Sequence, residues 1–528
     1  MTLAMAPPLP VKSRRIPWLL LIPAVLVALS MLIPVVYLFL RAFQADVDQA
    51  LALVFRSRNL DLLFNTLKLA AGVLAVATFL ALPLAWIVTR VRLVGQGFWT
   101  TLAIVPLAIP GYVMAYSLLS IGGHYGFMSR VFGISMSNIQ GYWGAVWALA
   151  LYTFPYLFLN IRSALQGLDA SLEESAQSLG YGRFDIATKI VIPQILPALM
   201  AGFLVIGLYV LGDFGAVALM RYDAFSYAIY NQYAGAYDRI YAAWLSLMLL
   251  ALALAFVLID VLLVRRRLSS VGSSSGRQVS KVSLGRYWLI AGPYMAFVYL
   301  ASIALPAAML LYWMLQVPVE AGLLTRVSMT FLNSAGAALP AALLAATLAI
   351  PICYLSVRYP SRLTALIERS TYIGYSLPPL TLALAMVFFA LQTAFFFYQT
   401  LGLLIVAWTM ATLVLAMGPI RSAIMQARPN IEEASYSLGY SGLQTFRFVL
   451  FPRLRRGTVA GIVLVFLFCM KELPITFLLS PTGFSTLAVS VFSRTAEGQM
   501  AEAAPFAVAI LLFSSLSVGM MLRQEKSQ

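Results

Sequence analysis

Continuous apolar runs of about twenty residues recur along the whole chain, and short polar segments separate them. A helix of about 20 apolar residues is long enough to cross the hydrocarbon of a bilayer. Because the runs are continuous rather than alternating, they favour helices over the strands of a membrane barrel. The pattern predicts twelve spans, at 17–40, 64–89, 98–120, 142–161, 198–220, 240–264, 287–315, 331–356, 364–391, 401–420, 457–479 and 501–522.

Composition and charge agree with an all-α polytopic membrane protein. Apolar residue types make up 62% of the 528 residues and charged types only 10%, which excludes an ordinary soluble domain. The net charge is +16, and its basic residues flank spans on one side of an even-numbered topology. They include Lys12, Arg14, Arg15, Arg90, Arg92, Arg265, Arg266, Arg267, Arg358, Arg362, Arg523 and Lys526. The positive-inside rule then predicts that both termini are cytoplasmic, and such scattered charge argues against nucleic-acid binding.

A few isolated residues carry no clear chemistry. The first span is long for a signal peptide and has no evident cleavage site, so we expect a retained helix. Cys353 and Cys469 both fall in predicted spans, where packing is the simplest role for them. His124, the one histidine, lies in a Gly-rich loop and cannot form a metal site unaided. The sequence therefore names no metal ligands.

The chain consists of two halves that repeat each other. A basic, Ser/Gly-rich segment at 265–286 has the composition of a flexible cytoplasmic linker near anionic headgroups, and it separates residues 1–264 from 287–528. Asn65 and Pro110 recur as Asn333 and Pro378, 268 residues later, and after the fourth span of each half the offset becomes 259. Because each half has six predicted spans, the repeats are parallel. A pseudo-twofold body with a seam between its halves suits transport, although duplication alone does not require it.

Each half also carries a polar hairpin after its fourth span, within 162–197 and 421–456, on the predicted cytoplasmic side. Acidic residues open a short helix, where they favour the positive end of the helix dipole. A glycine then ends that helix, and a second amphipathic stretch leads to a proline. Small residues would let another protein approach closely, although a hairpin lying on the membrane surface without a partner is the simpler alternative. The residues concerned are Glu173, Glu174, Ser175, Ala176, Gly180 and Pro193, and then Glu432, Glu433, Ala434, Ser435, Gly439 and Pro452.

Both hairpins resemble the EAA motif of ABC importer permeases. That motif is Glu-Ala-Ala, three residues, Gly, nine residues and Ile-x-Leu-Pro. The first hairpin matches from Glu174 to Pro193 and the second from Glu433 to Pro452, with Ser for one Ala in each copy. The resemblance implies a type I ABC importer (MetI-like) permease fold. It also implies that each loop carries a coupling helix, which docks in a groove of a cytoplasmic ABC ATPase dimer. We call 162–197 the first coupling loop and 421–456 the second.

The resemblance extends to the fused, two-in-one permeases of the ferric iron uptake family. The segments "GDFGAVAL" and "MKELPITFLL", in the fifth span of each half, are similar to sequences of that family. It implies a bacterial inner membrane location and ferric iron as the cargo, with the fused thiamine permeases as the nearest competitors. A periplasmic or surface-tethered binding protein would deliver the cargo and dock on outer loops near 41–63, 221–239 and 480–500.

Two acids in the fifth spans are candidates for the translocation pathway. Asp213 follows Pro193 by twenty residues, as Glu472 follows Pro452, so the two acids are repeat-equivalent. An ionisable group within a span is costly and by default a functional candidate. Such acids near an outer mouth would attract a cation, while Lys471 would neutralise Glu472 locally. Alternatively, these residues simply end or kink helices beside Gly212 and Pro474.

Prolines at 83, 110, 351 and 378 fall inside predicted spans, where they would act as hinges for switching or as static kinks. No phosphate-binding G-x-x-x-x-G-K-[ST] segment, metal-ligand cluster or nucleophile constellation occurs, so we expect no enzymatic activity. This chain would then bind no cofactor of its own, and ATP with Mg²⁺ would belong to the partner ATPase. A secondary transporter of the major-facilitator type is the alternative class, although "TRVRLVGQG" lacks the basic signature expected of its loop between spans two and three. A passive channel would leave the paired hairpins unexplained.

Overall fold

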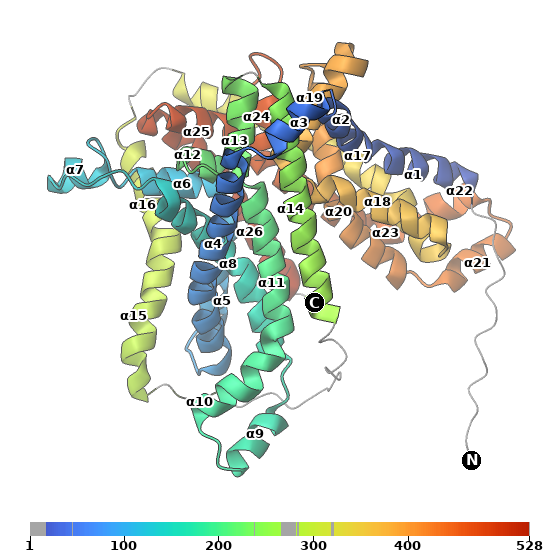
Figure 1. The fold of residues 1–528 in the computed structure, drawn as a ribbon. Coiled ribbons are helices and arrows are strands. Elements are labelled where there is room, and N and C mark those ends of the chain that lie inside the picture. Colours follow the sequence, from blue (N-terminus) through green and yellow to red (C-terminus); the bar gives the residue numbers. More distant parts are fainter. Residues whose placement is uncertain are drawn as a thin grey trace, which may run out of the picture. The chain divides into compact units, whose positions relative to one another are not determined.

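The computed structural model describes residues 17–44, 46–236, 238–265, 281, 283, 285–317 and 322–526. The elements in these ranges are α, 3-10 and π helices (Figure 1). The basic residues Lys12, Arg14 and Arg15 and most of the predicted linker lie outside the described residues. The prediction that the chain divides at 265–286 therefore stays a prediction.

The described chain forms two compact units. Unit 1 comprises residues 1–36, 336–376 and 405–469, and unit 2 comprises 37–335, 377–404 and 470–528. Unit 1 contains α1 (Trp18–Ser30), α18 (Arg362–Ser376), α21 (Pro429–Ser437), α22 (Gly442–Gln444) and the π segment η8 (Thr445–Leu450). Four helices run from one unit into the other, namely α2 (Ile33–Ala42), α17 (Leu323–Arg358), α20 (Leu401–Gln426) and α23 (Phe451–Lys471).

Unit 2 holds the remaining elements. Its first part consists of α3 (Val47–Val54), α4 (Ser57–Arg90), α5 (Gln96–Ile104), η1 (Val105–Ala108), α6 (Gly111–Leu119), α7 (Phe127–Phe132), α8 (Gly141–Gln166), α9 (Ala170–Ser178), α10 (Arg183–Ile186), η2 (Ala187–Val191) and α11 (Ile192–Gly212). There follow α12 (Gly215–Leu219), α13 (Phe225–Tyr230), η3 (Asn231–Gly235), α14 (Arg239–Arg265), η5 (Gly285–Tyr287), α15 (Trp288–Tyr299), η6 (Leu300–Ala304) and α16 (Leu305–Met314). The last are α19 (Pro379–Thr393), η7 (Phe395–Phe397), α24 (Pro474–Leu479), α25 (Leu487–Ala496) and α26 (Met500–Lys526).

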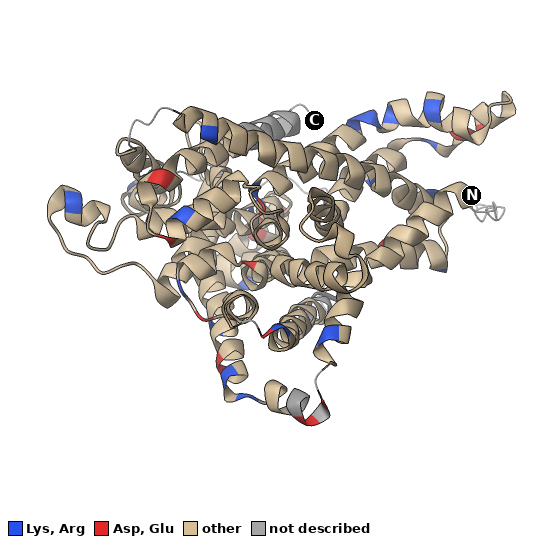
Figure 2. Ribbon diagram, turned by 90° about the horizontal axis from the view of Figure 1, so that it is seen from above, with Lys and Arg blue, Asp and Glu red and all other residues tan. Residues whose placement is uncertain are grey.

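Helices of membrane-spanning length account for most of the predicted spans. Among the described residues, eight helices are long and apolar enough to cross a membrane, or ten if each of two bent pairs counts as one span. The other two predicted spans, 457–479 and 501–522, fall on α23 with α24 and on α26. Three arginines near the start of α23 and Lys471 at its end shorten its apolar stretch. Lys, Arg, Asp and Glu are sparse along the ribbon, as expected of a multi-pass membrane protein (Figure 2).

The two bent pairs are broken at repeat-equivalent prolines. The predicted span 98–120 becomes α5 with η1 and then α6, which meet at 89°. Pro110 has an extended conformation immediately before α6, as Pro378 has before α19, within the predicted span 364–391. Proline lacks the N–H of the helical ladder and its ring crowds the preceding turn, so a helix tends to break there. Pro83 and Pro351, by contrast, lie within the unbroken helices α4 and α17. Whether any of the four acts as a hinge stays a prediction.

Hydrogen bonds in unit 2 show the repeat directly. In the first half, the Asn65 side-chain amide donates to the backbone carbonyl of Asp223 at 3.0 Å, and the Phe225 N–H donates to the Thr66 hydroxyl at 3.1 Å. The corresponding bonds of the second half join Asn333 to the carbonyl of Ser485 at 3.4 Å, and the Leu487 N–H to the Ser334 hydroxyl at 2.9 Å. The offset between the partners is now 262 residues, because the second half has three more residues after α24. The sequence repeat is therefore also a repeat of contacts.

Candidate functional site

The first coupling loop is a short helix, a glycine turn and a second helix. The Asp169 carboxylate accepts a hydrogen bond from the Ser171 N–H and so caps the start of α9. Gly180 has φ +85° and ends the helix, as the pattern predicts. The Tyr181 N–H donates to the Ala176 carbonyl at 3.1 Å, which satisfies a carbonyl of the last turn. In Figure 1, α9 and α10 lie at one end of α11, and α12 lies at its other end.

The second coupling loop has the same backbone plan in α21. Pro429 occupies the first turn of the helix, a position that proline tolerates. Gly439 again has φ +85°, and the Tyr440 N–H donates to the Ser435 carbonyl at 3.2 Å. The two loops therefore share a helix of the same length and the same turn.

A π-helical segment joins each loop to its fifth span. The segment η2 lies just before Pro193, and η8 lies just before Pro452. The ring of a helical proline crowds the carbonyl four residues earlier, and a π segment widens the helix at that point. The equivalent prolines thus account for a π-helical segment at the same place in both halves, just before the long helix.

A buried ion pair attaches the first coupling loop to the end of α4. The Arg90 guanidinium donates to a Glu173 carboxylate oxygen at 2.8 Å, and both side chains are largely buried. The guanidinium also lies 5.8 Å from the centre of the Trp86 ring. Two of its nitrogens, Nε and Nη1, are buried and have no hydrogen-bond acceptor among the described residues. Glu173 is therefore an internal contact of the chain.

The same ion pair recurs in the second coupling loop, with more partners. Arg358, at the end of α17, donates from Nε to Glu432 at 2.8 Å. Its Nη2 donates to the carbonyls of Ile424 and Ala427, at 3.2 and 2.5 Å. The Tyr354 hydroxyl donates to the other Glu432 oxygen at 2.8 Å. From the sequence alone, Arg90 and Arg358 are only flanking charges. Arg90 and Arg358 are repeat-equivalent, 268 residues apart, and so are Glu173 and Glu432, 259 residues apart. This repetition of a base and an acid in both halves was the signal for the pairing.

The second glutamate of each pair is exposed. Glu174 and Glu433 face outward, together with Ser175 and Ala434. The leucines that directly follow α9 and α21, Leu179 and Leu438, are each 78% exposed. A single exposed apolar residue is common on protein surfaces. Here, however, both coupling loops expose a leucine at the same position.

Two of the four small residues of the coupling loops face inward. Ala176 and Ser435 are buried within the chain, because they occupy the inner side of α9 and α21. The Ser435 and Thr445 hydroxyls are hydrogen-bonded to each other at 2.9 Å. Ala176 and Ser435 hold each loop together from inside. Of the four small residues, Ser175 and Ala434 are the exposed ones, and the close approach of another protein stays a prediction.

The pathway candidate Asp213 caps a helix. One of its carboxylate oxygens accepts hydrogen bonds from the N–H groups of Ala216 and Val217, at 2.9 and 3.3 Å, at the start of α12. The other oxygen accepts from the Tyr152 hydroxyl at 3.2 Å. The predicted span 198–220 accordingly ends at Gly212, where the chain turns.

Glu472 has the equivalent role at the start of α24. Its two oxygens accept from the N–H groups of Ile475 and Thr476, at 2.7 and 3.0 Å, and the Thr476 hydroxyl adds a bond of 2.8 Å. Beside it, the Lys471 ammonium donates to the Leu107 carbonyl at 3.4 Å. This geometry favours the alternative in which the two acids end helices, because both carboxylates are engaged by the backbone.

Comparison with known proteins decides the class. The family of binding-protein-dependent transport system inner membrane components matches the chain twice, at residues 77–269 and 338–525. The chain belongs to this family. It is therefore a multi-pass inner membrane permease of the ABC type, without catalytic activity of its own and working in a binding-protein-dependent system. A secondary transporter and a passive channel are thereby set aside.

Relatives of the permease include one fused chain of full length. The chain is 31% identical to the Fe(3+)-transport system permease protein FbpB 2 of Haemophilus influenzae, over 96% of this chain and 98% of that protein. Shorter relatives cover 29% of this permease. The molybdenum transport system permease protein ModB of Escherichia coli is 32% identical over 69% of its own length, and a probable sulfate transport system permease protein of Prototheca wickerhamii is 29% identical over 61%. The permease is thus a fused member of the ferric iron branch.

The remaining candidates are His124 and the two cysteines. His124 is exposed in its loop, and both cysteines are buried and not joined in a disulfide. Within the described ranges, no three residues of the types His, Cys, Asp and Glu are placed to hold a metal ion together.

Proposed function

We propose that this permease moves ferric iron across the bacterial inner membrane by alternating access, driven by ATP hydrolysis on a partner. The observation that carries the proposal is the full-length similarity to a fused Fe(3+)-transport permease. The shorter molybdenum and sulfate relatives support the class but differ in their named cargo.

The proposal places the chain with both termini in the cytoplasm. Arg90 and Arg92 after α4, and Arg358 and Arg362 around the end of α17, would then be cytoplasmic, in accord with the positive-inside rule. A periplasmic or surface-tethered binding protein would release its iron at the opposite face, near 41–63, 221–239 and 480–500.

The coupling loops would receive the motion of the ATPase. We propose that the exposed residues Glu174 and Glu433, with Leu179 and Leu438, contact the two subunits of a cytoplasmic ABC ATPase dimer, which binds ATP and Mg²⁺. The buried pairs Arg90–Glu173 and Arg358–Glu432 would pass the motion of each loop to α4 and α17, because each pair is joined by a charge-assisted hydrogen bond between largely buried side chains. The small residues Ser175, Ala176, Ala434 and Ser435 and the turns at Gly180 and Gly439 would shape the loops.

Uptake measured in cells tests the cargo and the class together. Cells producing the permease with its ATPase and binding protein receive radioactive ferric iron or radioactive thiamine, each in competition with the unlabelled other compound. We expect uptake of iron only, and we expect it to disappear in the double variant Glu174→Ala with Glu433→Ala. Thiamine uptake would overturn the cargo and keep the class.

A matched control separates coupling from folding. The double variant should reach the membrane in normal amounts, because both glutamates are exposed. Ser178→Ala with Ser437→Ala, one turn away on the same exposed surfaces, should transport as the unchanged permease does. Normal iron uptake by the glutamate double variant would remove the coupling role of these residues.

A further inference from the structure

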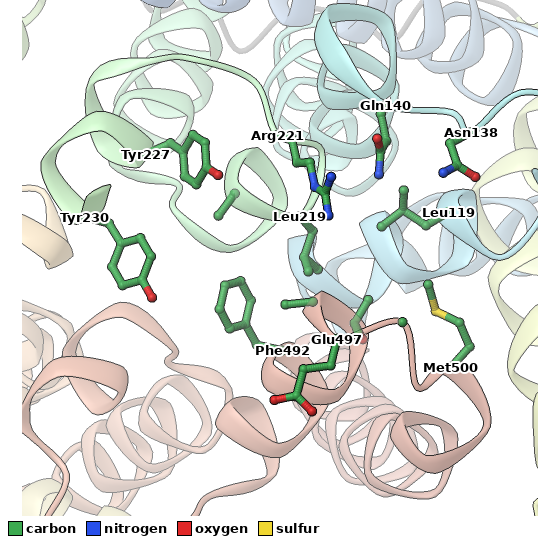
Figure 3. A pocket seen from close by; sticks show the side chains of 14 residues that line it. Leu119, Asn138, Gln140, Leu219, Arg221, Tyr227, Tyr230, Phe492, Glu497 and Met500 are labelled. Carbon is green, nitrogen blue, oxygen red and sulfur yellow. The ribbon is translucent and has the colours of Figure 1, made fainter. Parts of the chain in front are cut away.

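A cavity of about 420 Å³ lies in unit 2, at the end of α11 remote from the first coupling loop. Its walls come from both halves of the sequence (Figure 3). Hydrogen-bond donors gather on one wall: Figure 3 shows the Arg221 guanidinium and the Gln140 amide directed into the cavity, and the Tyr227 ring lies on the same side. Glu497 stands on the opposite wall with its carboxylate turned away from them.

Aromatic rings close one side of this cavity. Tyr230 and Phe492, which line it, occupy equivalent positions in the two repeats. Behind them lie Phe214 and Phe477, and the ring centres of neighbouring members are 5.0–6.0 Å apart. Phe214 follows Asp213 directly, and Phe477 belongs to α24, so the helices capped by the two acids carry part of this cluster. The cavity therefore ends on a packed aromatic barrier built by both halves.

Arg221 has an unfavourable backbone conformation. Its φ is +50°, a value that residues with a Cβ rarely adopt. The repeat places Gly483 at the equivalent position, 262 residues later, with φ +81°. The turn thus requires a left-handed residue in both halves, and one half meets the requirement with glycine. A non-glycine residue retained at such a position points to a function for its side chain. The described residues provide no hydrogen-bond acceptor or carboxylate partner for its guanidinium.

The charges available near the cavity do not suit a bare metal cation. The carboxylates of Asp213 and Glu472 are engaged as helix caps, and the one carboxylate among the described lining residues, that of Glu497, is turned away from the donor wall. The guanidinium of Arg221, by contrast, is exposed to the cavity. A trivalent cation alone would be repelled by a guanidinium, while a planar guanidinium recognises carboxylate and phosphate oxygens through paired hydrogen bonds. A volume of about 420 Å³ also falls in the range of small-molecule pockets and far exceeds that of one ion.

We infer that this cavity binds ferric iron as a complex with a small multidentate oxyanion, and that Arg221 recognises the anion. The inference rests on the proposed function and adds the chemical form of the cargo. The donor wall of Arg221, Gln140 and Tyr227 would contact anion oxygens, and the aromatic barrier would retain the complex until the permease switches. The shared chemistry is that of carboxylate or phosphate oxygens around the metal.

Double-label binding tests this directly. The complete complex of permease and ATPase, in lipid nanodiscs with and without a non-hydrolysable ATP analogue, receives radioactive iron premixed with radioactive citrate or with radioactive phosphate. We expect iron and one anion label to bind together, and the anion that binds identifies its source. Arg221→Gly should lower binding of both labels at least about tenfold, which corresponds to the loss of one charge-assisted hydrogen bond. Because glycine occupies the equivalent turn at 483, this variant should fold normally, which thermal unfolding checks.

Two further variants make the outcome decisive. Arg221→Lys keeps the charge without the planar fork and should bind weakly, while Glu497→Gln should reduce binding less than Arg221→Gly. If the site bound a bare cation, Glu497→Gln would reduce iron binding more than Arg221→Gly does. Iron bound without either anion, undiminished binding in Arg221→Gly, or no binding by the unchanged complex in either nucleotide condition would overturn the inference. Iron uptake measured in parallel distinguishes the two claims, since its absence in cells would overturn the proposed function itself.

Discussion

The two coupling loops present the same outer surface but are held together differently inside. Glu174 and Leu179 of the first loop correspond to Glu433 and Leu438 of the second, and all four are exposed. Behind this surface, the first loop is attached to its long helix by one hydrogen bond of an ion pair. The second has that ion pair and, in addition, bonds from Arg358 to two carbonyls and from Tyr354 to Glu432.

Four substitutions between the copies accompany the difference. Trp86 stands where the second half has Tyr354, and its indole stacks against Arg90 without reaching the acid. Ala176 and Ile186, both apolar and buried, occupy the positions where Ser435 and Thr445 form a hydrogen bond. Gly182 stands where Ser441 caps α22 by exchanging hydrogen bonds with Gln444.

A duplicated outer surface therefore need not come with duplicated rigidity. The proposed ATPase contact would depend on exposed residues, which the copies share. The proposed transmission of motion would depend on buried bonds, which they do not share. We therefore expect the second loop to follow its helix more closely than the first.

The largest predicted effect is the removal of the buried arginines. Arg358→Met should lower the free energy of unfolding by about 3–5 kcal/mol, because it leaves Glu432 buried without its cation and removes the two carbonyl contacts. Arg90→Met should cost less, about 1–3 kcal/mol, since it also removes two buried nitrogens that have no acceptor in the described part of the chain.

Thiol reactivity during heating measures both changes. Cys353 and Cys469 are buried in the folded chain, so a thiol-reactive dye reports unfolding of the purified permease. Arg362→Met, which removes a basic residue near the end of α17 that makes no described ion pair, is the control for loss of charge. Equal losses for the Arg358 and Arg90 variants would contradict the difference between the loops.

A smaller effect follows from exchanging the residues that face the ion pairs. Tyr354→Phe should cost about 1–2 kcal/mol, because it removes one hydrogen bond to a buried carboxylate. The reverse exchange, Trp86→Tyr, offers Glu173 a second donor and should make the first loop more protected in amide hydrogen exchange. Trp86→Phe, which lacks the hydroxyl, is the matched control. If amide exchange in residues 170–191 is no slower in Trp86→Tyr, the tyrosine hydroxyl is not what stiffens the second loop.

Much of this arrangement could be predicted from the sequence, because it follows from periodicity and spacing. The apolar runs place the spans, and Gly180 and Gly439 end the short helices as expected. The partners of Glu173 and Glu432 could not be predicted in the same way, because Arg90 and Arg358 lie more than seventy residues away and equally satisfy the positive-inside pattern. From the sequence, the role of Asp213 and Glu472 at helix ends was one of two open alternatives. The structure favours it because the chain turns after each long helix and the carboxylate then accepts bonds from N–H groups of the next helix.

The smallest predicted effect concerns the contact inside each loop. Ser435→Ala leaves the buried Thr445 hydroxyl without its partner and should cost about 1 kcal/mol. Adding Thr445→Ile recreates the apolar pair of the first loop, Ala176 with Ile186, and should restore most of that loss, since replacing both partners leaves no unpaired group. Thermal unfolding of the single and double variants measures the difference. A double variant less stable than Ser435→Ala alone would mean that the second loop cannot accommodate the packing of the first, and that the copies have diverged in backbone as well as in bonds.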